Sequence, residues 1–164
     1  LGSAFGSGVM IPGTGVILNN FLNWTDLNPV SPNALQPGQR IAMCLAPSIS
    51  TRSGKGILAL GTPGSYGILQ TQVQAMVGHL DFGLDIQAAI EMPRARLWDG
   101  KQVYLERRVP HSVCVELSTR GHDVALLPDY SWRTGGMQAV SRDPDSGALA
   151  GAADSRRDGA VIPA

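Results

Sequence analysis

The stretch from Gly56 to Leu80 holds the residues whose types and order best suit catalysis. An apolar run turns there through Gly61-Thr62-Pro63-Gly64-Ser65 into a stretch with helical periodicity, which predicts a strand, a glycine turn and a helix. Such a turn leaves backbone N–H groups unpaired at the positive end of the helix dipole, where an oxyanion can bind. We predict that the N–H groups of Gly64 and Ser65 are the donors, since donors held in a dry site lower an acyl-transfer barrier by roughly 3–4 kcal/mol. An ordinary strand-to-helix turn remains the alternative.

Ser65 could instead be a nucleophile, because a strand-turn-helix unit is also the setting of the nucleophile elbow. The elbow requires Gly-x-Ser-x-Gly, but Pro63 stands two residues before Ser65 and only Gly67 fits the pattern. The reaction would also need a histidine base. The three candidates lie at or near predicted helix ends, where a solvated cap is the commoner role: His79, His111 and His122.

Metal and cofactor sites are not indicated by the sequence. The three histidines and two cysteines lack the spacing of zinc ligands. Gly61, Gly64 and Gly67 form Gly-x-x-Gly-x-x-Gly, which is not the dinucleotide fingerprint. Cys44 and Cys114 lie far apart in apolar surroundings, so we expect two buried free thiols. We therefore expect no metal and no cofactor.

Several helices and strands must position the turn. The helix that follows it is predicted over about Ser65 to Leu80, with an apolar stripe facing a sheet: Leu69, Val73, Met76, Val77 and Leu80. A hairpin of residues 46–50 and 56–60 is expected before the turn. Asp85 should cap a second helix, Ile86 to Glu91. A third helix is predicted from Pro110 to Gly121, with three residues facing inward: Val113, Cys114 and Leu117.

The rest of the chain reads as short strands and loops. Four further strands are expected over residues 103–105, 124–127, 137–140 and 148–152. Near the start of the chain, residues 16–18 are predicted to form a strand. Residues 23–40 contain three prolines and predict a long ordered loop with three apolar anchors: Leu27, Val30 and Leu35.

Composition limits the class of protein. The chain has 164 residues, of which 43% are hydrophobic and 16% charged, with a formal net charge of zero. These values predict a folded core and argue against nucleic-acid binding, which requires a basic surplus. The 20 glycines and 11 prolines indicate a turn-rich α+β fold, and the length suits one domain over residues 1–164. No apolar run reaches the roughly 18 residues of a membrane span. The chain shows no targeting segment, which leaves a periplasmic or a cytoplasmic location open.

Eight short motifs follow one another in a fixed order along nearly the whole chain. They are Phe5-Gly6-Ser7-Gly8, Pro12-Gly13-Thr14-Gly15, Leu18-Asn19-Asn20, Pro37-Gly38-Gln39-Arg40, Gly61-Thr62-Pro63-Gly64, Asp81-Phe82-Gly83, Ala89-Ile90-Glu91-Met92-Pro93-Arg94 and Gly151-Ala152-Ala153-Asp154-Ser155-Arg156-Arg157-Asp158-Gly159. Together they resemble the small subunit of the γ-glutamyltranspeptidases, and the ordered set is far more specific than any single motif.

The resemblance implies an N-terminal-nucleophile hydrolase whose precursor cleaves itself and packs its two subunits into an αββα sandwich. A threonine at the new N-terminus attacks a γ-glutamyl amide such as that of glutathione, and the acyl group passes to water or an amino acid. In the family this threonine precedes the motif matched by Phe5 to Gly8, so we expect it to be absent from this chain, where Leu1 has no nucleophilic atom. The expected partner is the large subunit of the same precursor, and the chain alone is expected to be inactive and to self-associate.

The resemblance also places substrate-binding positions on this sequence. The oxyanion glycine pair falls on Gly64 and Ser65. Two serines that hold the substrate α-carboxylate fall on Met43 and Cys44.

The ligands of the substrate α-ammonium group are also replaced. They fall on Phe21 and Trp24, just after the matched Asn20, and the entrance position falls on Gly2. Only Asp26 could still supply a carboxylate.

These replacements of polar positions by apolar or bulky residues leave three hypotheses open. The substrate could be an acyl amide without the γ-glutamyl zwitterion, as in cephalosporin-type acylases, which the family also resembles. Alternatively, Phe21, Trp24 and Met43 could be core residues beside a shifted pocket. A non-catalytic scaffold is the third hypothesis.

Overall fold

The computed structural model describes residues 6–163, and the chain forms two compact units, Leu1–Met43 and Cys44–Ala164. Three residues named in the sequence analysis lie outside the described residues: Leu1, Gly2 and Phe5. The α-helices and strands of the second unit are β1 (Ser48–Arg52), β2 (Lys55–Gly61), α1 (Gly67–Leu80), α2 (Ile86–Glu91), β3 (Ala95–Leu97), β4 (Gln102–Glu106), α3 (His111–Thr119), β5 (Asp123–Leu127), β6 (Gln138–Arg142) and β7 (Leu149–Ala153), with short 3₁₀ turns at Trp132–Thr134 and Ser155–Arg157. This mixture of helices and strands confirms the α+β prediction.

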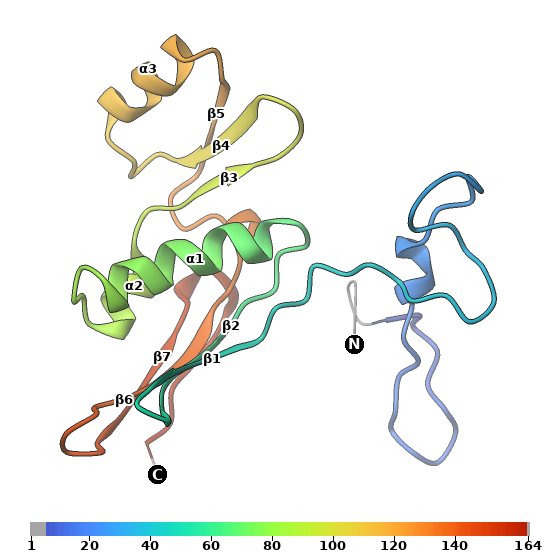
Figure 1. Ribbon diagram of the computed structural model, residues 1–164, viewed down its shortest axis with the longest axis horizontal. Helices are drawn as coiled ribbons and strands as arrows, with labels where there is room; N and C mark the ends of the chain where they lie inside the picture. The colour runs from blue at the N-terminus through green and yellow to red at the C-terminus, as the bar shows by residue number, and fades with distance from the viewer. Residues whose placement is uncertain (1–5, 164) are drawn as a thin grey trace. The chain divides into compact units, whose positions relative to one another are not determined.

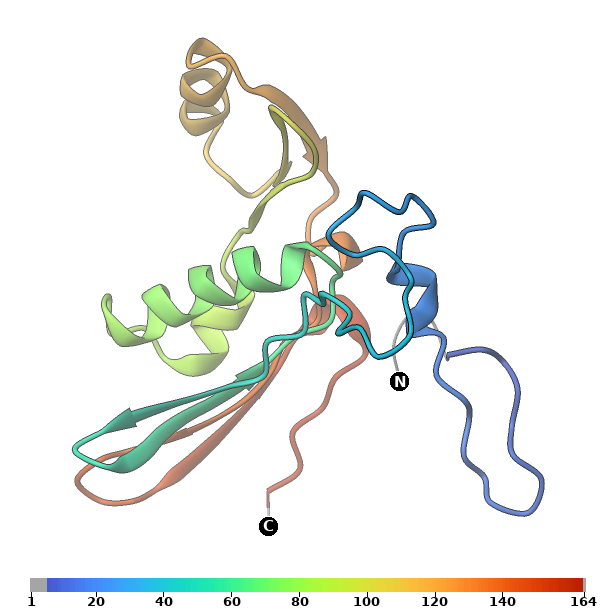
Figure 2. The ribbon, with the colours of Figure 1, turned by 45° about the vertical axis from the view of Figure 1, so that its right-hand side comes forward.

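An antiparallel sheet in the order β1-β2-β6-β7 forms the base of the second unit. Helices α1 and α2 lie on one face of it (Figures 1 and 2). The core between the two layers is made of Leu58, Leu60, Ala75, Ile86, Ile90, Met137, Ala139 and Ala152. Sheet residues alternate between this core and the opposite face, as the period of two in a strand requires.

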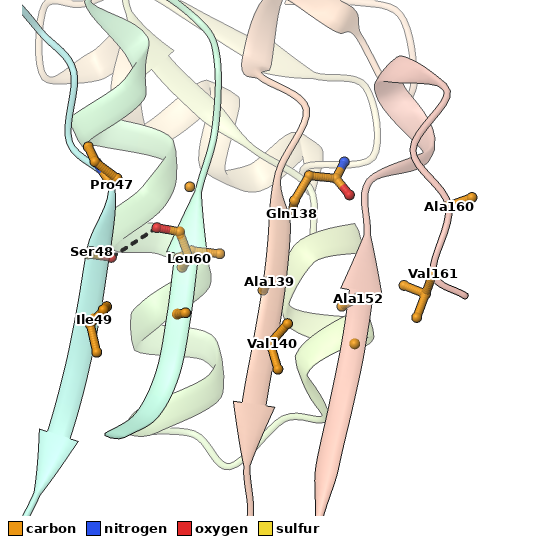
Figure 3. A pocket seen from close by; sticks show the side chains of 13 residues that line it. Pro47, Ser48, Ile49, Leu60, Gln138, Ala139, Val140, Ala152, Ala160 and Val161 are labelled. Atoms are coloured by element: carbon orange, nitrogen blue, oxygen red, sulfur yellow. Dashed lines mark hydrogen bonds between the residues drawn. The ribbon is translucent and has the colours of Figure 1, made fainter. Parts of the chain in front are cut away.

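The opposite face of this sheet carries no helix in the described part of the chain. Ile49, Ala59 and Val140 point to that side, where Ile49 is 74% exposed. Figure 3 shows the shallow apolar surface that they form with Val161 of the C-terminal segment. A sheet with one packed face and one open apolar face is half of a sandwich.

The second unit also contains a smaller sheet, in the order β3-β4-β5. Strands β4 and β5 are parallel and α3 connects them, as a parallel pair requires. Val103, Leu105 and Cys114 form its core. Strand β3 was not predicted from the sequence, because three residues with Arg96 in the middle do not give a recognisable apolar alternation.

The predicted apolar stripe of α1 is partly wrong. Leu69 and Val73 are each 56% exposed and Val77 is also exposed, whereas Met76 and Leu80 do pack on the core. Besides Ile68, the buried face instead carries small and polar residues: Gly67, Thr71, Gln72, Ala75 and Gly78. The helix lies so close to its neighbours that a Cβ at Gly78 would be 2.8 Å from the sulfur of Met92. Close packing therefore selects small residues for the inner face.

Glutamine side chains join helices to sheet edges. Gln74 accepts a hydrogen bond from the N–H of Ala95 (2.9 Å) and donates to its carbonyl (2.8 Å). Gln70 makes the same pair with Leu97 (2.7 and 3.2 Å), so two side chains of α1 satisfy the free edge of β3. Gln87 of α2 likewise accepts a hydrogen bond from the N–H of Ala153 in β7 (3.0 Å) and donates to its carbonyl (2.9 Å).

The other predicted elements of this unit are confirmed. The hairpin is β1–β2, the four further strands are β4 to β7, and α2 begins where Asp85 accepts a hydrogen bond from the N–H of Ala88 (2.9 Å). Helix α3 also forms, with Cys114 buried and Leu117 packed inward, but Val113 is 40% exposed. The inward position of Val113 is therefore corrected, because only one narrow stripe of α3 faces its sheet.

The first unit is held mainly by turns and hydrogen bonds. Among residues 6–43 the one helix is the 3₁₀ turn Phe21–Trp24, and the strand predicted over 16–18 is reduced to a single bridge between Met10 and Ile17. The loop of residues 23–40 is ordered by Asn33, whose amide donates to the carbonyl of Trp24 (2.5 Å) and accepts from the N–H of Ala42 (2.8 Å).

The apolar anchors predicted for this loop are wrong. Leu27, Val30 and Leu35 are exposed, and the small Ala34 is buried instead. A loop fixed by backbone and amide hydrogen bonds does not need large anchors.

Candidate active site

The turn between β2 and α1 has an unusual backbone. Gly64 has a φ of 143° and Ser65 a φ of 57°, so two successive residues adopt positive φ. The carbonyls of Gly64 and Ser65 accept the N–H groups of Gly67 (3.1 Å) and Ile68 (3.0 Å), which begins the helix. Within the described part of the chain the N–H groups of Gly64 and Ser65 donate to no other residue. The turn therefore offers two unpaired donors at the N-terminus of a 14-residue helix.

The segment Ser131–Gly136 lies directly behind this turn. A Cβ on Gly64 would be 3.6 Å from the Cα of Gly135, so the two backbones lie close together. Gly135 has a φ of 109°, and a Cβ there would lie 2.5 Å from Oγ1 of Thr62. Only glycine allows this approach.

A fully buried ionic cluster holds the segment Ser131–Gly136 in place through Thr134. Arg94 pairs with Asp154 (Nη1–Oδ2 2.7 Å), and Arg156 pairs with Glu106 (Nε–Oε1 2.6 Å) and with Asp154 (Nη1–Oδ1 3.1 Å). The same carboxylate oxygen of Glu106 accepts from the hydroxyl of Thr134 (2.9 Å), and Arg94 donates to the Thr134 carbonyl (2.9 Å). The cluster thus links β4, the end of α2 and the segment after β7 to the support of the turn.

The charges in the cluster stabilise one another. Burial alone would raise the pKa of Glu106, but hydrogen bonds and attraction from Arg156 hold it below its ordinary value. The pKa of Asp154 is likewise lowered, because Arg94 and two backbone N–H groups outweigh its burial. Burial and repulsion from Arg156 lower the pKa of Arg94 to about 10. All four groups therefore remain charged at neutral pH.

The positions expected near a substrate ammonium group lie in the first unit. Phe21 and Trp24 are half-buried members of the 3₁₀ turn. Asn20 stands at its N-cap, and the Oδ1 atom of Asn19 accepts the N–H groups of Asn20 (2.8 Å) and Phe21 (3.2 Å). Asp26 is exposed, and its carboxylate accepts the N–H of Asn28 (2.9 Å) within its own loop.

The positions expected near a substrate carboxylate differ in burial. Met43 is half-buried and ends the first unit, whereas Cys44 is buried in the second. Cys44 and Cys114 are both buried free thiols, which confirms that prediction. Burial lowers the pKa of Arg96, and smaller electrostatic contributions from Tyr104 and Cys44 oppose this shift.

The serine-hydrolase alternative receives no geometric support. Ser65 is exposed, and in the part of the chain that the structure describes no serine, threonine or cysteine is hydrogen-bonded to a histidine. His79 lies in the last turn of α1, where its Nδ1 atom is 2.7 Å from the carbonyl of Leu84. Among residues 6–163 no group of three His, Cys, Asp or Glu side chains could hold a metal ion.

The ionic cluster was not predicted from the sequence. Arg94 and Arg156 belong to the motifs quoted above, but without an assigned role, and Glu106 belongs to none of them. A usable signal was present, because a glutamate that ends the apolar run Val103–Leu105 of a chain with few charges is a candidate for a buried, paired group.

A strand-turn-helix unit with two free amide donors is an arrangement that can bind an oxyanion. The family model described as Gamma-glutamyltranspeptidase matches residues 1–164. The chain therefore belongs to the γ-glutamyltranspeptidase family, which confirms the resemblance. Its members include hydrolases, transferases and acylases.

Two characterised relatives show this range. The chain is 38% identical over 159 residues to the acylase ACY 1 proenzyme of Pseudomonas sp. strain SE83, covering 96% of this chain and 27% of the relative. It is 35% identical over 158 residues to the glutathione hydrolase proenzyme of Bacillus subtilis strain 168, covering 96% and 26%. The chain thus spans about a quarter of the length of these relatives.

Solved structures confirm the fold. The cephalosporin acylase of Bacillus halodurans has a TM-score of 0.86 at 37% identity, covering 96% of this chain and 29% of that one. The γ-glutamyltranspeptidase of Pseudomonas nitroreducens in complex with L-DON has a TM-score of 0.81 at 29% identity, covering 98% of this chain and 88% of that one. The fold is accordingly that of the N-terminal-nucleophile hydrolases, and the high coverage of the second chain agrees with the small-subunit resemblance.

Proposed function

We propose that this chain is the small-subunit portion of an N-terminal-nucleophile amidohydrolase or acyltransferase, in which Gly64 and Ser65 stabilise the oxyanion. The observation that carries the proposal is the pair of unpaired N–H groups at the start of α1. Backbone donors do this work, so a serine side chain at position 65 is compatible with it. Within the proposal, the nucleophilic threonine lies at a processing point before the matched motifs.

The proposed partner is the large subunit of the same precursor. The apolar sheet face of Figure 3 and the exposed residues Leu69 and Val73 of α1 support it, because a soluble chain rarely leaves such surfaces uncovered. The proposed substrate is a small acyl amide. No helix among the described residues is long and apolar enough to span a membrane.

An acyl chain without the γ-glutamyl ammonium group is the favoured substrate class. Burying an ammonium and a carboxylate without partners costs several kcal/mol. The side chains of Phe21 and Trp24 carry no oxygen that could accept from an ammonium group, and the carboxylate of Asp26 accepts a hydrogen bond within its own loop. Hydrolysis of γ-glutamyl amides such as glutathione is the alternative that the glutathione hydrolase relatives support.

The test is p-nitroaniline release from glutaryl and γ-glutamyl p-nitroanilides by the complete, processed protein. We expect turnover, retained in Ser65→Ala because the N–H of residue 65 is unchanged. The 164-residue chain expressed alone should be inactive, since no nucleophile is paired with a base in its described part. Turnover by this chain that Ser65→Ala abolishes would establish the serine-hydrolase mechanism instead. A complete protein with a processed N-terminal threonine but no amidase activity would favour the non-catalytic scaffold.

A further inference from the structure

We propose that Thr62 is a positioning residue that aims the N–H of Gly64 at the oxyanion. This inference rests on the proposed function, because it assigns a role within the same turn. Thr62 is half-buried and follows directly after β2. Its hydroxyl makes two hydrogen bonds, one with the supporting segment and one within the turn.

The first hydrogen bond ties Thr62 to the supporting segment. The N–H of Gly136 donates to Oγ1 of Thr62 over 3.1 Å. Gly136 lies two residues after Thr134, which is hydrogen-bonded to the buried residues Arg94 and Glu106. The hydroxyl oxygen is therefore fixed relative to the rigid ionic cluster.

The second hydrogen bond orients the peptide that carries the proposed donor. A hydroxyl has one proton and two acceptor sites, so accepting from Gly136 leaves the proton of Thr62 free. That proton is donated to the carbonyl of Pro63 over 2.9 Å. The Pro63–Gly64 peptide is trans, so its N–H points away from its C=O. Holding the carbonyl of Pro63 on one side thus directs the N–H of Gly64 to the other.

Gly135 makes the arrangement possible. A Cβ at this position would lie 2.5 Å from Oγ1 of Thr62 and 3.2 Å from the carbonyl oxygen of Pro63. An alanine there would push the hydroxyl and the carbonyl away together. Gly135→Ala is therefore a second route to the same displacement, one that keeps the threonine itself unmutated.

The test compares Thr62→Val, which removes the hydroxyl at nearly constant shape, with Thr62→Ser, which keeps it. In the complete processed enzyme with glutaryl p-nitroanilide as probe, we expect Thr62→Val and Gly135→Ala to lower kcat roughly 10- to 100-fold with KM changed less than about threefold, because a misaimed donor loses part of its effect in the transition state. Thr62→Ser should stay within about threefold of the wild type. Thr119→Val is the control, since among residues 6–163 that hydroxyl bonds only the carbonyl of Val115 on the exposed side of α3.

A measurement independent of turnover uses the amide resonance of Gly64 in protein labelled with ¹⁵N-glycine. We expect this resonance to move in Thr62→Val and not in Thr62→Ser. Equal kcat in wild type and Thr62→Val, equal losses in Thr62→Val and Thr62→Ser, or a change in KM alone would overturn the inference. If the wild type shows no amidase activity the proposed function fails, and the resonance still decides whether Thr62 orients the peptide: an unmoved Gly64 signal in Thr62→Val rejects it.

Discussion

Ser65 adopts a backbone conformation that serine rarely occupies, with a φ of 57°. A Cβ in this region costs roughly 1–2 kcal/mol, whereas glycine pays about 0.5–1 kcal/mol in folding entropy. We therefore expect Ser65→Gly to change the free energy of unfolding of the complete protein by less than about 1 kcal/mol. Ser65→Val should lower it by roughly 2 kcal/mol, because a branched side chain tolerates positive φ least. Chemical denaturation of the three proteins checks this, and equal stability of Ser65→Val and Ser65→Gly would contradict the strained turn.

Glu106 should govern the response of stability to acid. Its pKa and that of Asp154 are lowered in the folded protein, so their contribution is complete above the ordinary values near 4 and is lost as the pH falls through the folded values. We expect the melting temperature to be nearly constant from about pH 7 to 5 and to fall below about pH 4. Thermal denaturation across this range measures it.

Glu106→Gln should remove part of this acid response and leave Arg156 without a full partner. We expect the free energy of unfolding to fall by about 3–5 kcal/mol, as when other buried ion pairs lose one partner. Glu116→Gln is the matched control, since Glu116 pairs with Arg120 on the exposed surface of α3 and should cost less than about 1 kcal/mol. Equal losses in the two variants would show that the buried cluster does not stabilise the fold.

At the scale of elements, the contact between α1 and the edge of β3 depends on glutamine amides. Gln74→Leu removes both hydrogen bonds to Ala95, and we expect it to lower the free energy of unfolding by about 2 kcal/mol. Amide hydrogen exchange should then be faster at Ala95 than at Leu97. Gln70→Leu should show the reverse order. Gln36→Leu, on an exposed turn of the first unit, is the control. Unchanged exchange at Ala95 in Gln74→Leu would contradict the role of this side chain.

These elements also show how far the sequence can predict the fold. The turn residues and apolar alternation were enough for β1, β2 and the start of α1, because local patterns determine them. They were not enough for the buried face of α1, since Ala75 and Gly78 are buried for their small size rather than for their hydrophobicity. They also did not predict β3, whose free edge is hydrogen-bonded by glutamine side chains of α1.

The candidate site divides in the same way. The pair Gly64 and Ser65 could be located from sequence, because glycine before a helix has a direct conformational meaning. The supporting roles of Thr62 and Glu106 could not be predicted from the sequence. Thr62 is hydrogen-bonded to Gly136, which lies 74 positions further along the chain, and Glu106 to Thr134, which lies 28 positions further. Long-range polar contacts leave no periodic signal.

At the scale of the whole molecule, the open faces predict self-association of the isolated chain. Ile49 and Val140 on the sheet and Leu69 and Val73 on α1 are exposed apolar residues on two sides of the second unit. We expect the 164-residue chain to form dimers or larger species at micromolar concentration, measured by sedimentation velocity. Ile49→Lys should shift it toward monomer, while Val30→Lys in the exposed loop of the first unit should not. A strictly monomeric chain would contradict an uncovered sandwich half.

The most direct test of the central claim is the ratio of kcat/KM values for glutaryl and γ-glutamyl p-nitroanilide in the complete, processed enzyme. The two substrates differ only in the α-ammonium group, whose expected ligand positions here are Phe21 and Trp24. An ammonium buried without a partner loses several kcal/mol, so the ratio should favour the glutaryl substrate by roughly tenfold or more. A clear preference for the γ-glutamyl substrate would contradict the account, and would mean that Asp26 or the large subunit supplies the missing ligand.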